Sequence, residues 1–395
     1  MRLLRVIATM DPASGGPCQG IRNIVPTLEE MGVCNEVVSL DDPNAAFLGS
    51  DPFPIHALGP SKGMWNYSPK LRPWLNENLD RFDAVIIHGL WLYISYATSK
   101  AVRHFRNNVS PRGRSGQLKL FVMPHGMLDP YFQRAPGRRL KAIRNWFYWK
   151  LIEGNVVNKA DGIFFTCEEE LLLAREPFRP YLPQRELNVK YGIENPPDHS
   201  WEMREAFLRR CPQVHDKPYI LFLSRIHEKK GVDLLIKSYL NVAQDDSPKL
   251  VIAGPGMDTP YGEELKRLVE QSNRKNAIFF PGMLKGKEKW GAFYGSEAFI
   301  LPSHQENFGI AVVEALACGK PVLISNQVNI WREIERSGGC LVAEDTLKGT
   351  EYMLKKWFDM SGNTKQIMSK YARRSFEKHF HVMPAAQKML EAVTG

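Results

Sequence analysis

Two glutamates eight positions apart, Glu306 and Glu314, have the type and spacing to bind a ligand. They lie in the run HQENFGIAVVEALACGKPV, where Asn-Phe-Gly predicts a turn that leads into an amphipathic helix. Glu306 should then lie at the start of the helix and Glu314 about two turns along it. The unpaired N–H groups at a helix start suit a phosphate, and a carboxylate further along can accept hydrogen bonds from sugar hydroxyls.

The glutamate spacing resembles the Glu-x7-Glu motif of retaining family-four glycosyltransferases, which have the GT-B fold. Gly309 would let the backbone approach a ligand closely. The spacing alone fits two solvated glutamates on a surface helix equally well. Neighbouring motifs therefore have to decide between the two interpretations.

A strand, a basic loop and a helix are predicted about eighty residues upstream. The apolar run Tyr219-Ile-Leu-Phe-Leu runs into Ser-Arg-Ile-His-Glu-Lys-Lys-Gly, and a helical pattern starts at Val232. Open α/β sheets bind ligands at the carboxyl ends of their strands, and Arg225 and Lys230 would lie there. Such basic residues are often merely solvated. The resemblance makes these two the clamp on the donor diphosphate.

Weaker matches extend the resemblance over the C-terminal half. Ala253-Gly-Pro-Gly follows the apolar strand that begins at Lys249, and it resembles the Gly-x-Gly turn of the family. The strand Ala298-Phe-Ile-Leu-Pro then leads into the glutamate motif. The order of these pieces is that of the family.

A strand from Leu3 to Ala8 and a helix from about Cys18 to Met31 are predicted at the N-terminus. The turn between them holds Gly15 and Gly16, whose backbone N–H groups could reach a phosphate. In the family this loop faces the donor diphosphate. A plain strand-to-helix turn is the alternative.

Two histidines, His88 and His125, each end an apolar strand. An imidazole there could donate a hydrogen bond to a sugar hydroxyl or to a developing negative charge, and neither histidine has metal-ligand partners at zinc spacing. His125, in Pro-His-Gly, resembles the family's active-site histidine, which contacts the transferred sugar. His88 is the weaker match, and a purely structural role fits it as well.

Length and patterning predict an α/β protein of two Rossmann-like, doubly wound domains, which in the GT-B fold face each other across a cleft. A chain of 395 residues is too long for a single hydrophobic core, and apolar strands alternate with helical stretches throughout. We expect an N-terminal acceptor-side domain at 1–195, a nucleotide-sugar domain at 196–374 and a terminal helix at 375–395 that crosses back to the first domain. The linker between the two domains begins at Tyr191. It resembles the family's Asn-Gly-Ile-Asp, although Tyr191 replaces the asparagine. A C-terminal helix of the second domain is the alternative for 375–395.

The six cysteines are scattered without a Cys-x-x-Cys pair, and no signal peptide or long apolar run is visible. We therefore expect a cytoplasmic protein with reduced thiols, either soluble or peripheral at the inner face of a membrane. The net charge of +9 is concentrated in residues 101–150, which carry eleven Lys or Arg and one acid, Asp129. Such a patch could bind anionic lipid, an acidic acceptor or nucleic acid, and nucleic acid is the weakest candidate because no binding module is recognisable.

A basic, apolar helix is predicted inside this window, at residues 137–152. Leu140, Ile143, Phe147 and Leu151 form one stripe. We hypothesise that the helix touches an anionic membrane carrying a lipid-linked acceptor. The residues on the acceptor or membrane side would be His88 and, in this helix, Arg138, Arg139, Lys141, Arg144, Trp146 and Trp149. The alternative is that the stripe packs the helix onto its own sheet.

These motifs together predict a retaining, metal-independent glycosyltransferase that needs no cofactor and moves a sugar from a nucleoside diphosphate sugar to a saccharide or lipid-linked acceptor. Its clamp would be Arg225 and Lys230, with Glu314 on the ribose and Glu306 and His125 on the sugar. The backbone amides on the diphosphate would be those of Asn307, Phe308, Gly309 and Ile310. A sugar-nucleotide epimerase and a non-catalytic membrane-associated scaffold remain as alternatives.

Overall fold

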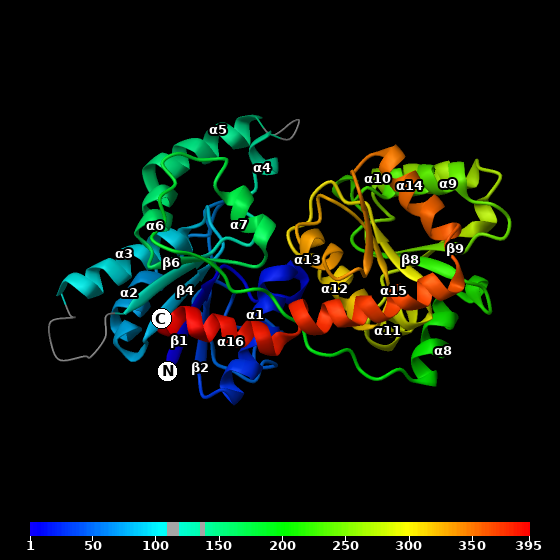
Figure 1. The fold of residues 1–395 in the computed structure, drawn as a ribbon. Coiled ribbons are helices and arrows are strands. Elements are labelled where there is room, and N and C mark those ends of the chain that lie inside the picture. The colour runs from blue at the N-terminus through cyan, green and yellow to red at the C-terminus, as the bar shows by residue number, and fades with distance from the viewer. Residues whose placement is uncertain (109–117, 135–138) are drawn as a thin grey trace. The chain divides into compact units, whose positions relative to one another are not determined.

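The chain folds into two compact units, each with a sheet of its own (Figure 1). The computed structural model describes residues 1–108, 118–134 and 139–395. The N-terminal unit comprises Met1–Gly192 and Val382–Gly395, and the C-terminal unit comprises Ile193–His381. The division after Gly192 lies three residues before the boundary expected from the sequence.

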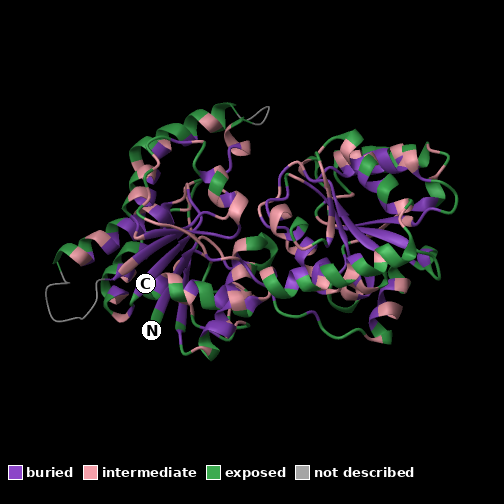
Figure 2. Cartoon of the chain, in the orientation of Figure 1, coloured by how far each residue is buried: buried purple, intermediate pink, exposed green. Residues whose placement is uncertain are grey.

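A seven-stranded, all-parallel sheet forms the centre of the N-terminal unit, in the order β3-β2-β1-β4-β5-β6-β7. Its strands are β1 (Arg2–Ile7), β2 (Cys34–Ser39), β3 (Ile55–Ala57), β4 (Ala84–His88), β5 (Lys119–Met123), β6 (Gly162–Phe165) and β7 (Glu186–Asn188). Most of the central strands are buried on both faces, as Figure 2 shows, and this explains their nearly continuous apolar sequences. Arg5, in the middle of β1, is a fully buried exception.

Helices cover this sheet, with α1 packed against α16 and α2 against α3. The helices are α1 (Gly16–Glu30), α2 (Leu71–Asn78), α3 (Tyr93–Asn108), α4 (Tyr131–Arg134), α5 (Arg139–Tyr148), α6 (Gly154–Lys159), α7 (Glu168–Ala174) and α16 (Val382–Thr394). A π-helical turn, Trp149–Glu153, joins α5 to α6. Helix α1 begins two residues before the expected Cys18, directly at the Gly15-Gly16 turn.

The C-terminal unit repeats the plan with six parallel strands in the order β10-β9-β8-β11-β12-β13. These are β8 (Tyr219–Leu223), β9 (Lys249–Ala253), β10 (Ile278–Gly282), β11 (Ala298–Leu301), β12 (Val322–Ser325) and β13 (Cys340–Ala343). The helices are α8 (Trp201–Arg210), α9 (Val232–Val242), α10 (Pro260–Glu270), α11 (Gly286–Gly295), α12 (Ile310–Ala317), α13 (Trp331–Glu335), α14 (Leu347–Phe358) and α15 (Gly362–Ser375). The expectation of two doubly wound α/β sheets is confirmed.

The end of the chain is divided between the two units. Helix α15 and the π-helical turn Phe376–Phe380 belong to the C-terminal unit, and only α16 belongs to the N-terminal unit. Lys119 donates hydrogen bonds from Nζ to the carbonyl of Val393 at 2.8 Å, which ties the end of α16 to β5. The change of unit therefore occurs at Val382, seven residues after the expected position.

Each sheet has a topological switch point next to its first strand. β1 lies between β2 and β4, and β8 lies between β9 and β11, so the chain leaves each first strand in two directions. Ligands of such sheets bind outside the carboxyl ends of the strands at this point. Ligands are therefore expected at the loops that follow β1 and β4 in one unit, and at those that follow β8 and β11 in the other.

Candidate functional site

The loop after β8 carries the two predicted cations of the C-terminal unit. Arg225 is exposed, and its guanidinium makes no ion pair within the described part of the chain. Lys230 is buried, in a short 3-10 turn that precedes α9. Gly231, at φ +65°, ends this turn, and a Cβ there would lie 2.1 Å from the carbonyl oxygen of Pro302. The loop can therefore lie directly against the segment that follows β11.

That close approach brings Lys230 to Glu306. The Nζ atom of Lys230 donates to the Oε2 atom of Glu306 in a largely enclosed ion pair. The backbone of Glu306 is fixed as well, since its N–H donates to Gln327 and its carbonyl accepts from Asn329, both at 2.9 Å. Two residues that are 76 positions apart in sequence are thus brought together at the switch point of the sheet.

Glu306 precedes α12, which corrects the expectation that it begins the helix. The N-cap of α12 is Gly309 at φ +76°, and the helix starts at Ile310. Glu314 is therefore about one turn into the helix and not two. Asn307 accepts a 3.4 Å hydrogen bond from Asn329, and the buried ring of Phe308 packs against Phe380. Phe308 can accordingly offer a ligand its backbone but not its side chain.

Glu314 is paired with Lys289 of α11, a residue that sequence reasoning missed. The Nζ atom of Lys289 lies 2.7 Å from Oε1 of Glu314 and 4.2 Å from the ring centroid of Trp290. Burial raises the pKa of the Glu314 carboxyl, and the charge of Lys289 opposes that rise. No motif surrounds Lys289, so only the tertiary contact between Lys289 of α11 and Glu314 of α12 could reveal it.

The Gly-Pro-Gly turn after β9 supports the basic loop. A Cβ on Gly254 would lie 1.8 Å from the carbonyl oxygen of Ser224, and one on Gly256 would lie 2.6 Å from that of Ile226. Ile226 donates from its N–H to the carbonyl of Pro255 at 2.8 Å. The glycines are thus explained by close packing beneath the loop that carries Arg225.

In the N-terminal unit, the Gly15-Gly16 turn forms the start of α1. Gly15 has φ +87° and caps the helix, and a Cβ on either glycine would meet nothing within 4 Å. The hydroxyl of Tyr191 donates to the carbonyl of Gly16 at 2.9 Å, and its ring lies so near Gly20 that a Cβ there would be 2.4 Å away. Tyr191, which departs from the family's asparagine, therefore holds the first turn of α1.

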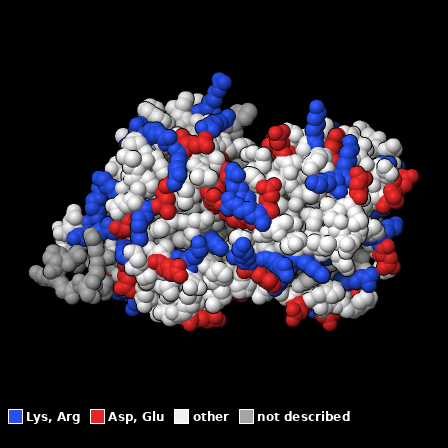
Figure 3. Space-filling model, viewed as in Figure 1, with Lys and Arg blue, Asp and Glu red and all other residues white. Residues whose placement is uncertain are grey.

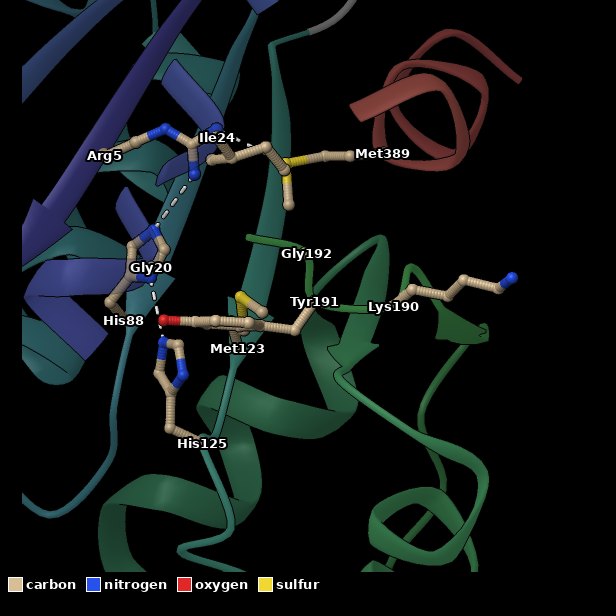
Figure 4. A pocket seen from close by; sticks show the side chains of 10 residues that line it. All are labelled: Arg5, Gly20, Ile24, His88, Met123, His125, Lys190, Tyr191, Gly192 and Met389. Atoms are coloured by element: carbon tan, nitrogen blue, oxygen red, sulfur yellow. Dashed lines mark hydrogen bonds between the residues drawn. The ribbon is translucent and has the colours of Figure 1, made fainter. Parts of the chain in front are cut away.

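His88 and His125 lie next to each other at the ends of β4 and β5 (Figure 4). His88 Nδ1 is 3.0 Å from His125 Nε2, and the rings are stacked with centroids 5.2 Å apart. His88 is buried, whereas His125 keeps partial access to solvent. Burial, together with the charge of Arg5, lowers the pKa of His125 to about 4 and that of His88 well below its usual range.

Two charged residues that sequence reasoning missed support these histidines. Arg5 approaches His88 Nε2 with Nη1 at 3.4 Å, and Glu170 of α7 accepts from the N–H of Gly126 at 2.5 Å. Glu170 also accepts from the N–H and hydroxyl of Thr166. An arginine inside an apolar strand is a sequence signal that could have pointed to Arg5. Glu170 lies in a run of three glutamates and gave no signal.

The apolar stripe of α5 is exposed, so the alternative that it packs onto the sheet is wrong. Leu140 is 84% exposed and Leu151 75% exposed, and Ile143, Phe147 and Trp146 are each about half exposed. Blue side chains project from the surface over α5 in Figure 3. The exposed cations on this segment are Arg139, Lys141, Arg144 and Lys150.

Trp149 does not belong to this surface, which corrects its assignment to the membrane side. It is 1% exposed and stacks on Phe178 with ring centroids 4.8 Å apart. The π-helical turn that begins at Trp149 rotates the residues after it relative to an α-helix. The prediction of an uninterrupted helix at 137–152 did not include this rotation. Arg138 lies outside the described residues.

Chemically, the C-terminal unit offers two cations, a carboxylate and the start of a helix around one edge of its sheet. The N-terminal unit offers a glycine turn and a neutral histidine pair. No group of three or more His, Cys, Asp or Glu side chains suited to a metal ion occurs in the described ranges. Nor does any helix in those ranges have both the length and the apolarity to cross a bilayer.

Comparison with known proteins gives two family matches and several relatives. Residues 15–188 match the glycosyl transferase 4-like domain, and residues 204–375 match the glycosyl transferases group 1 family. An uncharacterized glycosyltransferase of Methanocaldococcus jannaschii is 31% identical over 148 residues, which are 36% of this chain and 37% of that protein. The alpha-monoglucosyldiacylglycerol synthase of Streptococcus pneumoniae is 31% identical over 105 residues, 26% of this chain and 23% of that protein.

The similarity to solved structures extends over the whole chain. Anabaena Alr3699/HepE in complex with UDP and glucose is similar with a TM-score of 0.72 at 15% identity, over 100% of this chain and 99% of that one. The matches to the curated relatives span well under half of those proteins, whereas the similarity of fold extends over 100% of this chain. With both of its halves matched to glycosyltransferase domains and with this fold, the chain belongs to the glycosyltransferases of the GT-B fold.

Proposed function

We propose that this protein is a retaining glycosyltransferase of the hexosyltransferase type. It moves the sugar from a nucleoside diphosphate sugar to an acceptor hydroxyl. The observation that carries the proposal is the largely enclosed ion pair of Lys230 and Glu306, with exposed Arg225 on the same loop as Lys230, at the switch point of the C-terminal sheet. A planar, unpaired guanidinium beside a lysine suits a diphosphate. The Anabaena structure, a complex with UDP and glucose, supports a nucleotide sugar as the donor.

The leaving diphosphate is neutralised in this proposal by protein groups and not by a metal ion. Arg225 and Lys230 supply two positive charges, and the backbone amides from Asn307 to Ile310 supply the partial charge of a helix start. In the N-terminal unit, Gly15 and Gly16 leave open backbone at the start of α1, which suits a phosphate. Full activity in the presence of a chelator is the expected result, and activity that is lost with chelator and restored by manganese would overturn this part.

The sugar and ribose are assigned to the remaining residues. Glu314 accepts hydrogen bonds from the ribose hydroxyls, Glu306 contacts the donor sugar, and His125 donates to the sugar that is transferred. His125 suits this role because its Nδ1 has no partner within the described part of the chain and its ring keeps access to solvent. A neutral imidazole can donate one hydrogen bond without adding charge.

The acceptor is proposed to be a lipid-linked or lipid-anchored hydroxyl at an anionic membrane surface, in glycolipid or polysaccharide assembly. The exposed stripe of α5 supports this, since a large apolar surface with flanking cations suits the headgroup region of a bilayer. Each cation near an anionic surface adds about 1 kcal/mol. The synthase of Streptococcus pneumoniae carries a diacylglycerol product in its name, which is consistent with such an acceptor.

The test begins with a thermal-shift screen of nucleotide sugars, because a ligand that binds only the folded protein raises its unfolding temperature. The stabilising donor is then incubated with and without lipid and saccharide acceptors, and nucleotide release is measured. Release that requires an acceptor supports transfer. Conversion of the donor sugar without nucleotide release would instead indicate an epimerase, and binding without turnover across a broad acceptor panel would indicate a non-catalytic scaffold.

A further inference from the structure

The histidine pair of the N-terminal unit has a hydrogen-bonding direction that the protein itself fixes. Arg5 is fully buried on β1 and donates from Nε to Asn35 Oδ1 at 3.0 Å. Its Nη2 lies 3.3 Å from Met389 Sδ of α16, and its Nη1 lies 3.4 Å from His88 Nε2 (Figure 4). These three partners are an amide, an imidazole and a thioether, and the buried guanidinium orients them.

A guanidinium can only donate hydrogen bonds. His88 Nε2, facing Arg5, must therefore act as an acceptor, and the proton of a neutral His88 lies on Nδ1. That Nδ1 faces His125 Nε2 at 3.0 Å, so His125 Nε2 must accept in turn. The only nitrogen of His125 left to carry a proton is Nδ1.

We propose that Arg5 and His88 are positioning residues that hold His125 in its Nδ1-protonated tautomer, so that the enzyme presents a fixed hydrogen-bond donor to the transferred sugar. The identity of the group facing Nδ1 rests on the proposed function, but the tautomer itself does not. In this arrangement His125 orients the sugar and does not serve as a proton acid.

The surroundings favour the neutral form of both rings. The cavity beside them, about 10 Å³, has room for no more than about one water, and its other lining residues include Lys190 and Tyr191. The Lys190 side chain extends away from both imidazoles in Figure 4, and the Tyr191 hydroxyl is engaged by Gly16. The carboxylate of Glu170, on α7, is occupied by the N–H groups of Gly126 and Thr166. No carboxylate among the described residues forms an ion pair with His88 or His125, so nothing described there favours an imidazolium.

Two substitutions at position 88 separate the proposed role from general packing. An asparagine amide can place an N–H where His88 Nδ1 lies and can still donate to His125. A glutamine amide reaches the position of Nε2 instead, where it can accept from Arg5 but leaves His125 without its donor. His88→Asn should thus preserve the tautomer of His125, and His88→Gln should release it.

The decisive measurement is long-range ¹H–¹⁵N NMR of the imidazole rings in full-length protein labelled at histidine, with His125→Asn to assign the signal. We expect a single Nδ1–H tautomer of His125 in the parent at pH 6 to 8 and in His88→Asn, and a tautomer mixture in His88→Gln. Arg5→Met should move the titration of His125 upward from about 4 toward the ordinary value of about 6.5. An Nε2–H tautomer of His125 in the parent protein would overturn the proposal even if no variant folds.

Activity provides a second readout that fails separately. If the proposed function holds, the turnover number should fall about tenfold or more in His88→Gln and much less in His88→Asn, with the Michaelis constant for the donor little changed. Equal losses in both variants, with folding and nucleotide affinity intact, would contradict the positioning role. If no sugar donor is ever turned over, the proposed function fails while the NMR result still decides the tautomer.

Discussion

The Nζ atom of Lys289 lies 2.7 Å from Oε1 of Glu314, so the second glutamate of the motif is engaged by a lysine of α11. A carboxylate that is to accept hydrogen bonds from ribose hydroxyls must be ionised, and burial works against this. Lys289 is the group that opposes the effect of burial. The pair therefore links nucleotide binding to pH in a way that the glutamate spacing alone does not predict.

At pH 8, Glu314→Gln should weaken binding of a nucleoside diphosphate by about ten- to a hundredfold, because hydrogen bonds to a charged acceptor are lost. Lys289→Met should raise the pKa of Glu314 further. The Lys289→Met variant should therefore bind the nucleoside diphosphate more weakly at pH 6 than at pH 8. Isothermal titration calorimetry at both pH values measures this. A 2′,3′-dideoxy nucleotide serves as the control and should bind the parent and Glu314→Gln equally. If Glu314→Gln weakens binding of the dideoxy nucleotide as much as binding of the nucleoside diphosphate, Glu314 does not contact the ribose hydroxyls.

Arg225→Ala and Lys230→Ala should cost more affinity for a nucleoside diphosphate than Glu314→Gln does, since each leaves a phosphate charge unpaired. Each loss should be about 1.5–3 kcal/mol or more. Affinity for the corresponding nucleoside, which lacks phosphates, should not change. Lys237→Ala, which removes an exposed lysine of α9, is the matched control. Unchanged diphosphate affinity in the Arg225/Lys230 double variant would show that these residues are not the clamp.

His125→Ala should lower the turnover number by about a hundredfold while leaving the dissociation constant for the nucleoside diphosphate unchanged. The reason is that its proposed contact is with the sugar and not with the diphosphate. Steady-state kinetics combined with nucleotide titration distinguish the two effects. A normal turnover number with only a raised Michaelis constant for the donor would contradict the assignment.

Glu153 should make the stability of the N-terminal unit depend on pH. It is fully buried, accepts from the N–H of Trp91 at 2.8 Å and from the hydroxyl of Ser95, and its Oε2 has no partner in the described structure. Burial raises the pKa of this carboxyl from 4.5 to about 7. The folded protein therefore holds the proton more tightly than the unfolded chain, and stability should fall as the pH rises from about 4.5 through 7.

The contribution of Glu153 to this loss should be on the order of 1–3 kcal/mol. In Glu153→Gln, which cannot ionise, the part of the pH dependence between 5 and 8 that is due to this residue should disappear. Urea unfolding at several pH values measures the difference between parent and variant. A difference that is the same at pH 5 and pH 8 would show that Glu153 is ionised equally in both states.

The exposed surface of α5 should bind vesicles that contain anionic lipid. Changing Arg139, Lys141 and Arg144 together to glutamine should abolish the salt-sensitive part of co-sedimentation, because cations near an anionic surface are screened by salt. Changing Leu140 and Leu151 to serine should reduce binding at low and high salt alike.

The matched control for this surface changes three exposed lysines of the C-terminal unit to glutamine: Lys217, Lys266 and Lys348. This control should bind like the parent. Binding that is equal and insensitive to salt in all variants, or absent from all, would remove the membrane from the proposal and leave a soluble anionic acceptor for the basic residues.

The sequence by itself determined the fold class and the position of most candidate residues along it. Parallel strands buried on both faces must be apolar throughout, so β1, β4, β8 and β11 could be recognised, and the polar residues just after them had to lie at one edge of each sheet. That is why Arg225, Lys230 and His125 could be placed from local patterns. The position of Glu306 before α12 depended on one left-handed glycine, Gly309, and was predicted only approximately.

Only the tertiary structure decided which side chains meet. Lys289 pairs with Glu314 because α11 packs near α12, and Arg5 reaches His88 because adjacent parallel strands set their side chains in register. A stripe of apolar residues looks the same whether a helix packs inward or faces solvent, so the exposure of α5 and the burial of Trp149 could not be read from spacing. Contacts between residues distant in sequence depend on packing geometry, and local sequence patterns do not carry that information.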